Sequence, residues 1–533
     1  MQRRDFLLAA AATVAAAHAD TEPTAPAASR PPAEAMEEWS LADIAAAFDG
    51  HRLTSRELTQ RYLDRIDRLD RRGPQLKSVI ETNPHALEIA EQLDVERRAG
   101  KSRGLLHGIP ILIKDNIETA DHMMTTAGSL ALEGWYAPKD APLIERLRNA
   151  GAVILGKSNL SEWANFRSTH SISGWSGRGG QTRNPYALDR TPSGSSSGSA
   201  AAASANLCAL AVGTETDGSV VSPASINGIV GIKPTVGLVS RTGIAPISRS
   251  QDTAGPLTRT VRDAAIMLGV MSGLDGADAA SVAAGKHFES DYVRYLDPDG
   301  LKGARLGIAR KFFADNAPLN AYLDECIAKL KGAGAVIVDP ADLPLHGSFG
   351  AAEQEVLLYE FKTDLNAYLQ RLRITQPVRS LDALIRFNEA HRSREMPYFD
   401  QELLHQTQAK GPLSETAYLK ARSECLTATR SKGIDAVMAE HRLDAMVSLT
   451  SGPAWLIDIV DGDADSGSCS SPAAVAGYPH ITVPSGLYRG LPVGLSFFGS
   501  AFSEPKLIKL ASGFEHVARA RTVPRFALSV PAI

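Results

Sequence analysis

Residues 207–219 read LCALAVGTETDGS, an apolar run that ends in a tight polar turn. A short apolar run bounded by turn residues is typical of a strand that is buried on both faces of a sheet. In the turn, Gly218 lets several consecutive backbone N–H groups point into one cavity, which suits an oxyanion. Ser219 could then attack a carbonyl group held there. The same residues also fit an ordinary β-turn, so this stretch alone leaves both interpretations open.

Similar apolar runs recur along the chain. Three of them precede a turn rich in Gly, Ser or Thr and then a helical pattern: Ile109–Ile113, Val153–Leu155 and Gly228–Ile232. Three more lie near the C-terminus: Ala445–Leu449, His480–Pro484 and Val493–Phe498. Strands that alternate with helices predict an α/β fold with a large mixed sheet covered by helices on both faces. If the late strands rejoin that sheet, residues 37–533 form a single large domain.

Helical patterns fill much of the remaining chain. One helix begins after Ser40, and a second begins at the capping box of Thr54 and Glu57. A third is predicted for Pro84–Arg98. The middle of the chain, residues 277–441, is predicted to be mostly helical.

The composition excludes several classes of protein. The 56 Lys and Arg residues nearly balance the 60 Asp and Glu residues, giving a net charge of −4, so no nucleic-acid partner is expected. The four cysteines are scattered without a CxxC pair, and no HExxH motif occurs, so we predict no metal and no cofactor. The cysteines are best interpreted as buried small apolar residues, although a disulfide remains open because the N-terminus suggests export.

The N-terminus has the features of a targeting segment. Arg3 and Arg4 precede Phe-Leu and an Ala-rich run, which ends in an A-x-A site at residues 17–19. This pattern resembles a twin-arginine export signal at 1–19, and it predicts a periplasmic or secreted protein; the alternative is an unstructured tail. Residues 20–36 form a predicted linker. The apolar run of about 13 residues is shorter than the ~20 that span a bilayer, so stable membrane insertion is not expected.

Lys114 ends the otherwise apolar strand pattern Ile109–Ile113. A buried lysine is destabilised in its charged form, so its pKa falls and it can act as a neutral base. The alternative is a lysine at a strand end whose ammonium group reaches water, and this segment alone favours that alternative.

Residues 192–199 read PSGSSSGS and lead into an Ala-rich helix. They contain a literal GxSxG, which would make Ser196 the nucleophile of a Ser-His-Asp esterase. That motif needs a preceding core strand, whereas residues 184–191 are polar and turn-like. The later histidines, such as His441, His480 and His516, have no persuasive sequence context.

Taken together, Lys114, the Ser-rich loop and residues 216–219 resemble the amidase signature family of serine hydrolases. The motifs GIVGIKPT (228–235) and QDTAGP (251–256) extend the resemblance, which covers most of the chain from about residue 40. Two residues depart from the family pattern: Ser193 replaces a Gly at the start of the Ser-rich loop, and Asp217 replaces the usual Gly before Gly218. The residues around Asp217 and the run GRGGQTRNP (177–185) look most like the bacterial peptide amidase branch.

The resemblance implies a catalytic triad of Ser219, Ser195 and Lys114, in which Ser195 passes the proton of Ser219 to neutral Lys114. It further implies a cis peptide between Gly194 and Ser195, and oxyanion donors in the N–H groups of residues 216–219. Ser196 either supports its loop by hydrogen bonding or is a plain structural serine. Asp252, within the QDTAGP motif, is expected to stabilise a loop.

The implied activity is hydrolysis of carboxylic amides. The first expectation is deamidation of C-terminal peptide amides, so the expected partner is a small amide or a short amidated peptide. Hydrolysis of fatty-acid amides or aryl acylamides is the alternative within the family. A non-hydrolytic role as one component of an amidotransferase is the alternative outside hydrolysis, and predicted export argues against it. The sequence does not indicate the oligomeric state.

Overall fold

The computed structural model describes residues 36–373, 378–464 and 466–530. The predicted export signal (1–19) and the predicted linker (20–36), apart from Met36, lie outside the described residues. Within the described ranges, no helix is both long and apolar enough to cross a membrane.

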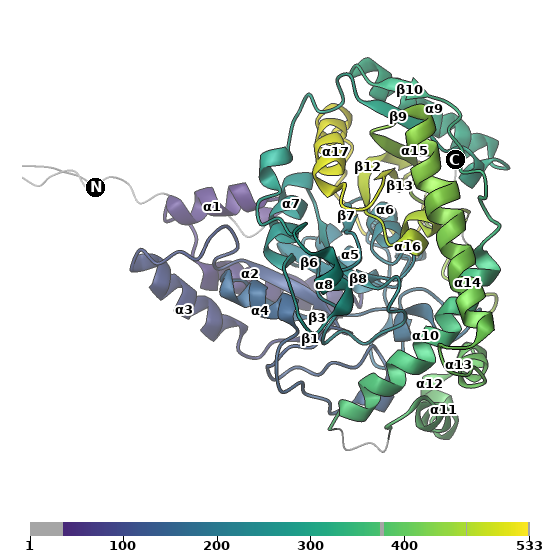
Figure 1. Ribbon diagram of the computed structural model, residues 1–533. Helices are drawn as coiled ribbons and strands as arrows, with labels where there is room; N and C mark the ends of the chain where they lie inside the picture. The colour runs from purple at the N-terminus through teal and green to yellow at the C-terminus, as the bar shows by residue number, and fades with distance from the viewer. Residues whose placement is uncertain (1–35, 374–377, 465, 531–533) are drawn as a thin grey trace, which may run out of the picture.

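Among the described residues, eleven strands form one mixed sheet at the centre of the molecule (Figure 1). Their spatial order is β1 (Val79–Thr82), β3 (Val153–Ser158), β2 (Pro110–Lys114), β6 (Leu210–Glu215), β8 (Thr253–Thr258), β7 (Val230–Lys233), β12 (His480–Tyr488), β13 (Leu491–Phe498), β11 (Ala445–Leu449), β9 (Arg305–Ile308) and β10 (Val336–Val338). β2 is parallel to β3 and β6, and β9 is parallel to β10 and β11. The other neighbouring pairs are antiparallel. A short separate ribbon pairs β4 (Trp175–Ser176) with β5 (Gly180–Gln181).

The helices of the described chain are α1 (Leu41–Asp49), α2 (Ser55–Arg65), α3 (Ala86–Arg98), α4 (Pro142–Asn149), α5 (Ser197–Ser204), α6 (Val221–Ile226), α7 (Val261–Met271), α8 (Ala279–Ala284), α9 (Ala317–Gly332), α10 (Gly350–Arg371), α11 (Leu381–Ala390), α12 (Arg392–Glu395), α13 (Glu402–Gln408), α14 (Thr416–Leu426), α15 (Asp435–His441), α16 (Ser471–Ala476) and α17 (Glu504–Ala518). α5 and α6 pack together on the sheet, α5 on β6 and α6 on β12. α7 packs with α4 and α17 on β8 and β12. The long helices α10 and α14 pack against each other along one side of the molecule (Figure 1).

The predicted fold class is confirmed. The late strands rejoin the sheet, with β12 beside β7 and with β13 and β11 following, so the chain forms one large domain. Ser40 and Thr54 cap α1 and α2 with complete capping boxes. The third helix starts at Ala86 rather than at Pro84.

Four strands of the sheet, β1, β8, β9 and β10, are not among those predicted from the sequence. β8 contains Gly255 and Pro256, which indicate a turn locally, yet pairing with β6 and β7 on its two sides keeps it extended. β1 is a short edge strand, and β9 and β10 interrupt the region that was predicted to be mostly helical. The strand predicted at Leu207–Val212 in fact runs from Leu210 to Glu215, because residues 213–215 pair with β8.

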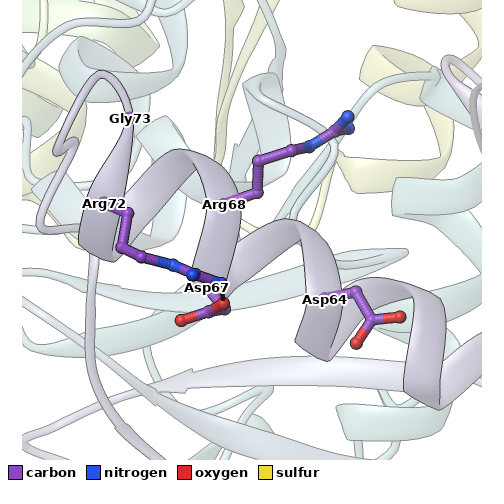
Figure 2. Close-up of a pocket in the computed structure, with 5 residues that line it drawn as sticks. All are labelled: Asp64, Asp67, Arg68, Arg72 and Gly73. Atoms are coloured by element: carbon purple, nitrogen blue, oxygen red, sulfur yellow. Dashed lines mark ion pairs between the residues drawn. The ribbon is translucent and has the colours of Figure 1, made fainter.

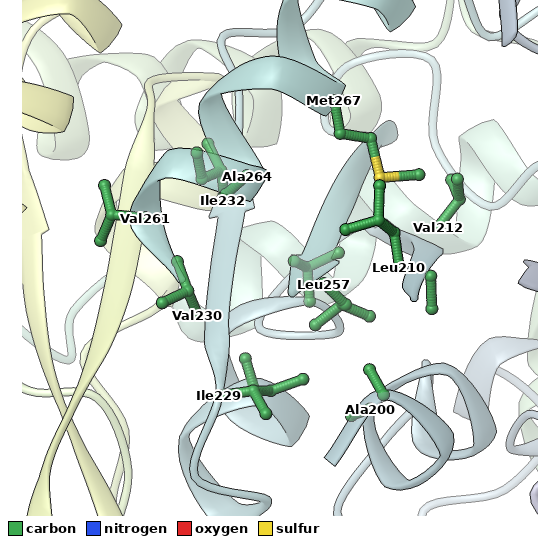
Figure 3. Close-up of a cluster of buried hydrophobic side chains, with 14 of the residues drawn as sticks. Ala200, Leu210, Val212, Ile229, Val230, Ile232, Leu257, Val261, Ala264 and Met267 are labelled. Carbon is green, nitrogen blue, oxygen red and sulfur yellow. The ribbon is translucent and has the colours of Figure 1, made fainter. Parts of the chain in front are cut away.

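The main core lies between the central strands and the helices that cover them. Figure 3 shows part of it, a cluster that includes Leu210 and Val212 of β6, Val230 of β7, Leu257 of β8 and Met267 of α7. All residues of β2, β3, β6, β7 and β8 are buried. A sheet that is buried on both faces therefore positions the strand ends from which the candidate site is built.

Candidate active site

Lys114 is the last residue of β2, and its side chain is fully buried. Its Nζ lies 2.8 Å from Ser195 Oγ, 3.0 Å from Ser196 Oγ, 2.8 Å from Thr214 Oγ1 and 3.1 Å from the Thr214 carbonyl oxygen. Burial lowers the pKa of Lys114 to about 7, although the carboxylates of Asp252 and Glu215 act in the opposite direction. The alternative in which Lys114 reaches water from the strand end is therefore wrong, because the Ser-rich loop and Thr214 of β6 surround its amine.

Ser195 lies in the Ser-rich loop directly before α5, and its side chain is fully buried beside Lys114. The peptide bond between Gly194 and Ser195 is cis, as the family resemblance implied. A Cβ atom at residue 194 would lie 2.3 Å from Ser161 Oγ, so only glycine fits at this position. The close packing of this loop fixes the position of the Ser195 hydroxyl.

Ser196 is bound to strand β6. Its Oγ accepts a hydrogen bond from the Thr214 N–H at 3.1 Å and donates to the Thr214 carbonyl at 3.0 Å. The expectation that Ser196 supports its loop by hydrogen bonding is confirmed. His480, one of the histidines that a Ser-His-Asp site would need, instead contacts Ser496 Oγ through its Nε2. These contacts do not support the esterase interpretation.

The turn at residues 216–219 connects β6 to α6. Glu215 shapes it, because its Oε2 accepts hydrogen bonds from the N–H groups of Val220 at 2.8 Å and Val221 at 3.0 Å. Gly218 has a φ of 76°, a left-handed conformation that favours glycine. Among the described residues, the backbone N–H groups of residues 216–219 have no hydrogen-bond acceptor. Four unpaired donors in one turn suit an oxyanion.

Ser219 is 7% exposed, which leaves its side chain slightly accessible. Its carbonyl oxygen accepts a hydrogen bond from the Ser196 N–H at 3.2 Å, and this bond joins the turn to the Ser-rich loop. The structure thus brings together the three segments that the sequence singled out. Within the described part of the chain, the Ser219 hydroxyl has no protein hydrogen-bond partner, so its link to Ser195 stays a prediction.

Two further residues approach the turn from distant parts of the chain. Ser470 Oγ donates to Asp217 Oδ1 at 2.6 Å, and Gln251 Nε2 donates to Glu353 on α10 at 2.9 Å. Burial and the nearby Asp217 carboxylate raise the pKa of Glu353 well above its ordinary value. Sequence reasoning missed Ser470 and Glu353, and no local pattern marks either residue.

Asp252 stabilises a loop, as expected. Its Oδ2 accepts hydrogen bonds from the N–H groups of Ile247 at 2.8 Å and Ser248 at 2.9 Å. Its Oδ1 accepts a hydrogen bond from Thr216 Oγ1 at 2.6 Å, which the sequence did not predict.

The cysteines and a surface hollow lie outside these segments. All four cysteines are free and buried, as predicted. Within residues 36–373, 378–464 and 466–530, no group of three or more His, Cys, Asp or Glu side chains is arranged to hold a metal ion. Figure 2 shows the surface hollow after α2, lined by Asp64, Asp67, Arg68, Arg72 and Gly73, in which Arg72 pairs with Asp67. This hollow contains none of the predicted site residues.

Comparisons with known proteins agree with this geometry. The model of the Amidase family matches residues 57–508. The crystal structure of native peptide amidase from Stenotrophomonas maltophilia is 52% identical with a TM-score of 0.88, and the match covers 92% of this chain and 99% of that one. A protein named probable amidase from Arabidopsis thaliana is 43% identical over 500 residues, 92% of each chain. One component of the glutamyl-tRNA(Gln) amidotransferase of Halorhodospira halophila is 34% identical over 508 residues, 90% of this chain and 98% of that protein.

Proposed function

This chain belongs to the amidase family, the amide-hydrolysing enzymes of the amidase signature type, and we propose that it removes the terminal carboxamide of peptides. In this proposal Ser219 is the nucleophile, Lys114 is the base and Ser195 carries the proton between them. The observation that carries the proposal is the buried Lys114 amine, 2.8 Å from Ser195 Oγ and next to a turn of unpaired N–H groups.

Lys114 is suited to act as a neutral base. With a pKa of about 7, a large fraction of the amine is unprotonated at neutral pH, and a general base is most efficient when its pKa is near the working pH. A neutral amine has two hydrogens and one lone pair. The Thr214 carbonyl can only accept, and the Ser196 hydroxyl hydrogen already points to that carbonyl. One N–H bond can then face the Thr214 carbonyl and the other the Ser196 oxygen, an arrangement that leaves the lone pair available to the Ser195 hydroxyl.

The reaction then follows from the order of these groups. Ser219 Oγ attacks the amide carbon while its proton passes to Ser195, and the Ser195 proton passes to Lys114. The negative charge on the substrate oxygen is stabilised by the N–H groups of residues 216–219; loss of one such donor typically costs about 2.7–4 kcal/mol of transition-state stabilisation. The same route returns a proton to the nitrogen, which leaves as ammonia. Water then cleaves the acyl-enzyme and releases the free acid.

The substrate class is supported by the likeness to peptide amidase and by the residues around the turn. Asp217 belongs to the turn that forms the proposed oxyanion site, and the negative charge of its carboxylate disfavours a ligand that already carries a carboxylate. A neutral carboxamide avoids this repulsion, whereas the free-acid product is repelled.

Export of the enzyme is part of the proposal. The Arg3-Arg4 pair and the A-x-A site at 17–19 support a twin-arginine signal. Replacing both arginines by lysine keeps the positive charge, so ordinary secretion would continue, whereas twin-arginine export would stop. We expect the Arg3→Lys/Arg4→Lys protein to stay in the cytoplasm with its N-terminus uncleaved; unchanged periplasmic delivery would contradict this route.

A matched substrate set tests the activity on purified protein. It contains an amidated peptide, the same peptide as free acid, the peptide extended by one residue, and a long-chain fatty amide. We expect ammonia from the amidated peptide alone at a high rate. Faster cleavage of the fatty amide, or cutting of internal bonds, would reject the peptide-amide assignment. Absence of ammonia from every amide would instead favour the amidotransferase alternative, which the 34% identical Halorhodospira halophila protein represents.

A further inference from the structure

A large pocket of about 1030 Å³ is lined in part by Asp252, which binds Thr216 of the turn at residues 216–219. We refer to it as the rear pocket, and its charged lining includes Arg241, Arg249, Asp252, Asp275, Asp364 and Arg371. Neither Ser195 nor Ser219 is among the residues that line this pocket.

A second, much smaller cavity of about 10 Å³ adjoins the rear pocket, since Ile244 and Asp252 line both. Asn116, Thr214, Thr216 and Asp252 are among the residues that line it. Thr214 Oγ1 lies 2.8 Å from Lys114 Nζ and accepts a hydrogen bond from Asn116 Nδ2 at 3.0 Å. Asp252 lines both cavities, so its carboxylate lies in the wall between the rear pocket and the polar groups around Lys114.

Three hydrogen-bond donors fix the Asp252 side chain in this wall. One carboxylate oxygen binds two backbone N–H groups of residues 247 and 248, and the other binds Thr216 Oγ1 at 2.6 Å. Thr216 belongs to the turn that supplies the proposed oxyanion donors. A carboxylate held on both oxygens therefore has a defined position relative to both the turn and Lys114.

We propose that Asp252 is a positioning residue for amide hydrolysis, which fixes Thr216 in the oxyanion turn and stabilises the protonated form of Lys114 through its negative charge. This inference rests on the proposed function, in which Lys114 is the base. Asp252 thereby sets the lowest pH at which the enzyme works.

The charges around these two groups define the expected pH behaviour. Lys114 is faced by two carboxylates, Asp252 and Glu215, and Glu215 is occupied by the N–H groups of Val220 and Val221. Asp252 is faced by two cations, Lys114 and Arg241. Burial raises the pKa of Asp252 to about 6, so it is ionised at neutral pH and loses its charge in more acidic solution.

The test is Asp252→Asn, which removes the charge and keeps the shape. The Asn oxygen can accept from the two backbone N–H groups, while its NH₂ group donates to the Thr216 hydroxyl, which can also accept. Without the nearby carboxylate, Lys114 loses its proton more easily. We expect the acid limb of kcat/KM to move to lower pH by about one unit, which is roughly a tenfold gain in relative rate on that limb. The rate at which a fluorophosphonate labels Ser219 should shift in the same way, because it reports nucleophile activation without turnover.

Two further variants make the result specific. Asp275→Asn removes another carboxylate of the rear pocket, one that binds the hydroxyls of Ser240 and Thr242. The acid limb of kcat/KM should stay at the wild-type pH in this variant. Thr216→Val keeps the Asp252 charge but removes its bond to the turn, so it should lower kcat without moving the limb; this variant tests the inference even if Asp252→Asn fails to fold. The inference is overturned if Asp252→Asn is active and the acid limb of its kcat/KM profile lies at the wild-type pH. It is also overturned if the acid limb moves in Thr216→Val. A wild-type enzyme that hydrolyses no amide contradicts the proposed function instead.

Discussion

Two fully buried lysines lie on neighbouring strands of the sheet, and they have different surroundings. Lys114 ends β2 and Lys157 lies in β3. Lys157 is paired in register with Ile113, the residue before Lys114, so the two lysines point to opposite faces of the sheet. Burial lowers the pKa of both amines. Burial of a lysine is therefore not what distinguishes the proposed catalytic base.

The groups that surround the two amines make the difference. Lys157 Nζ donates to the Ile117 carbonyl and to Thr125 Oγ1, both at 2.7 Å, and the carboxylate of Asp115 favours its charged form. Lys114 contacts the hydroxyl of Ser195, which belongs to a loop bonded to the Ser219 turn. The hydrogen bonds of Lys157 thus join it to structural groups only, whereas Lys114 can exchange a proton with the Ser195 hydroxyl.

The largest effect is expected for activity when the two lysines are changed in the same way. Lys114→Met should lower kcat/KM by roughly 10²–10⁴-fold, since that is the usual contribution of a general base. Lys157→Met should retain nearly the wild-type kcat per folded molecule, because no proton route passes through it. Steady-state assays, normalised to the fraction of folded protein by circular dichroism, measure both. An equal loss of kcat in the two variants would break the distinction.

A double variant tests whether Lys114 and Ser195 act as one unit. Lys114→Ala and Ser195→Ala should each remove most of the activity, and combining them should add little, because the relay fails once either member is lost. The matched combination of Lys157→Met with Ser195→Ala should show independent effects. Rates measured for the four single and double variants give the coupling, and additive losses for Lys114 and Ser195 would contradict the relay.

The sequence predicted the Lys114 side of this comparison and missed the Lys157 side. Lys114, Ser195 and Ser219 carry family motifs, and each follows or precedes a clear apolar pattern. Lys157 lies beyond the predicted strand Val153–Leu155, so no sequence pattern placed it in the core. Its partners come from a loop whose path depends on tertiary packing.

The same limit applies to the fold and to the rest of the site. Strands with continuous apolar runs were predicted, but β8 is held extended by its two neighbours despite Gly255 and Pro256. The contact of Asp252 with Thr216 spans 36 positions of sequence and that of Ser470 with Asp217 spans 253. A single chain carries no local pattern for such contacts, because the sheet order that creates them is a property of the whole domain.

A moderate effect on stability is expected for Lys157. Lys157→Met leaves the buried Ile117 carbonyl and the Thr125 hydroxyl without their amine partner, and a lost buried hydrogen bond of this kind costs about 1–3 kcal/mol in the free energy of unfolding. Urea denaturation of the purified protein measures the change. Thr125→Val, which removes one of the two partners, should show a smaller loss in the same direction, and a stabilised Lys157→Met protein would contradict the assigned structural role.

The last effect is gradual: a lowered lysine pKa produces a slope in stability against pH. The pKa of Lys114 is about 7 in the folded protein and near 10.5 when unfolded, so between these values the unfolded chain binds more protons. The free energy of unfolding therefore gains up to about 1.4 kcal/mol per pH unit as pH rises through this window, and loses it as pH falls.

Lys114→Met removes this contribution, so the difference between wild type and variant should grow in favour of wild type from pH 7.5 to about 9.5. Lys233, with a pKa of about 8, adds a similar slope to both proteins and cancels in the difference. Urea unfolding at several pH values supplies the measurement. A difference that does not change with pH would mean that Lys114 keeps an ordinary pKa, and the contrast between the two buried lysines would then rest on their hydrogen-bond partners alone.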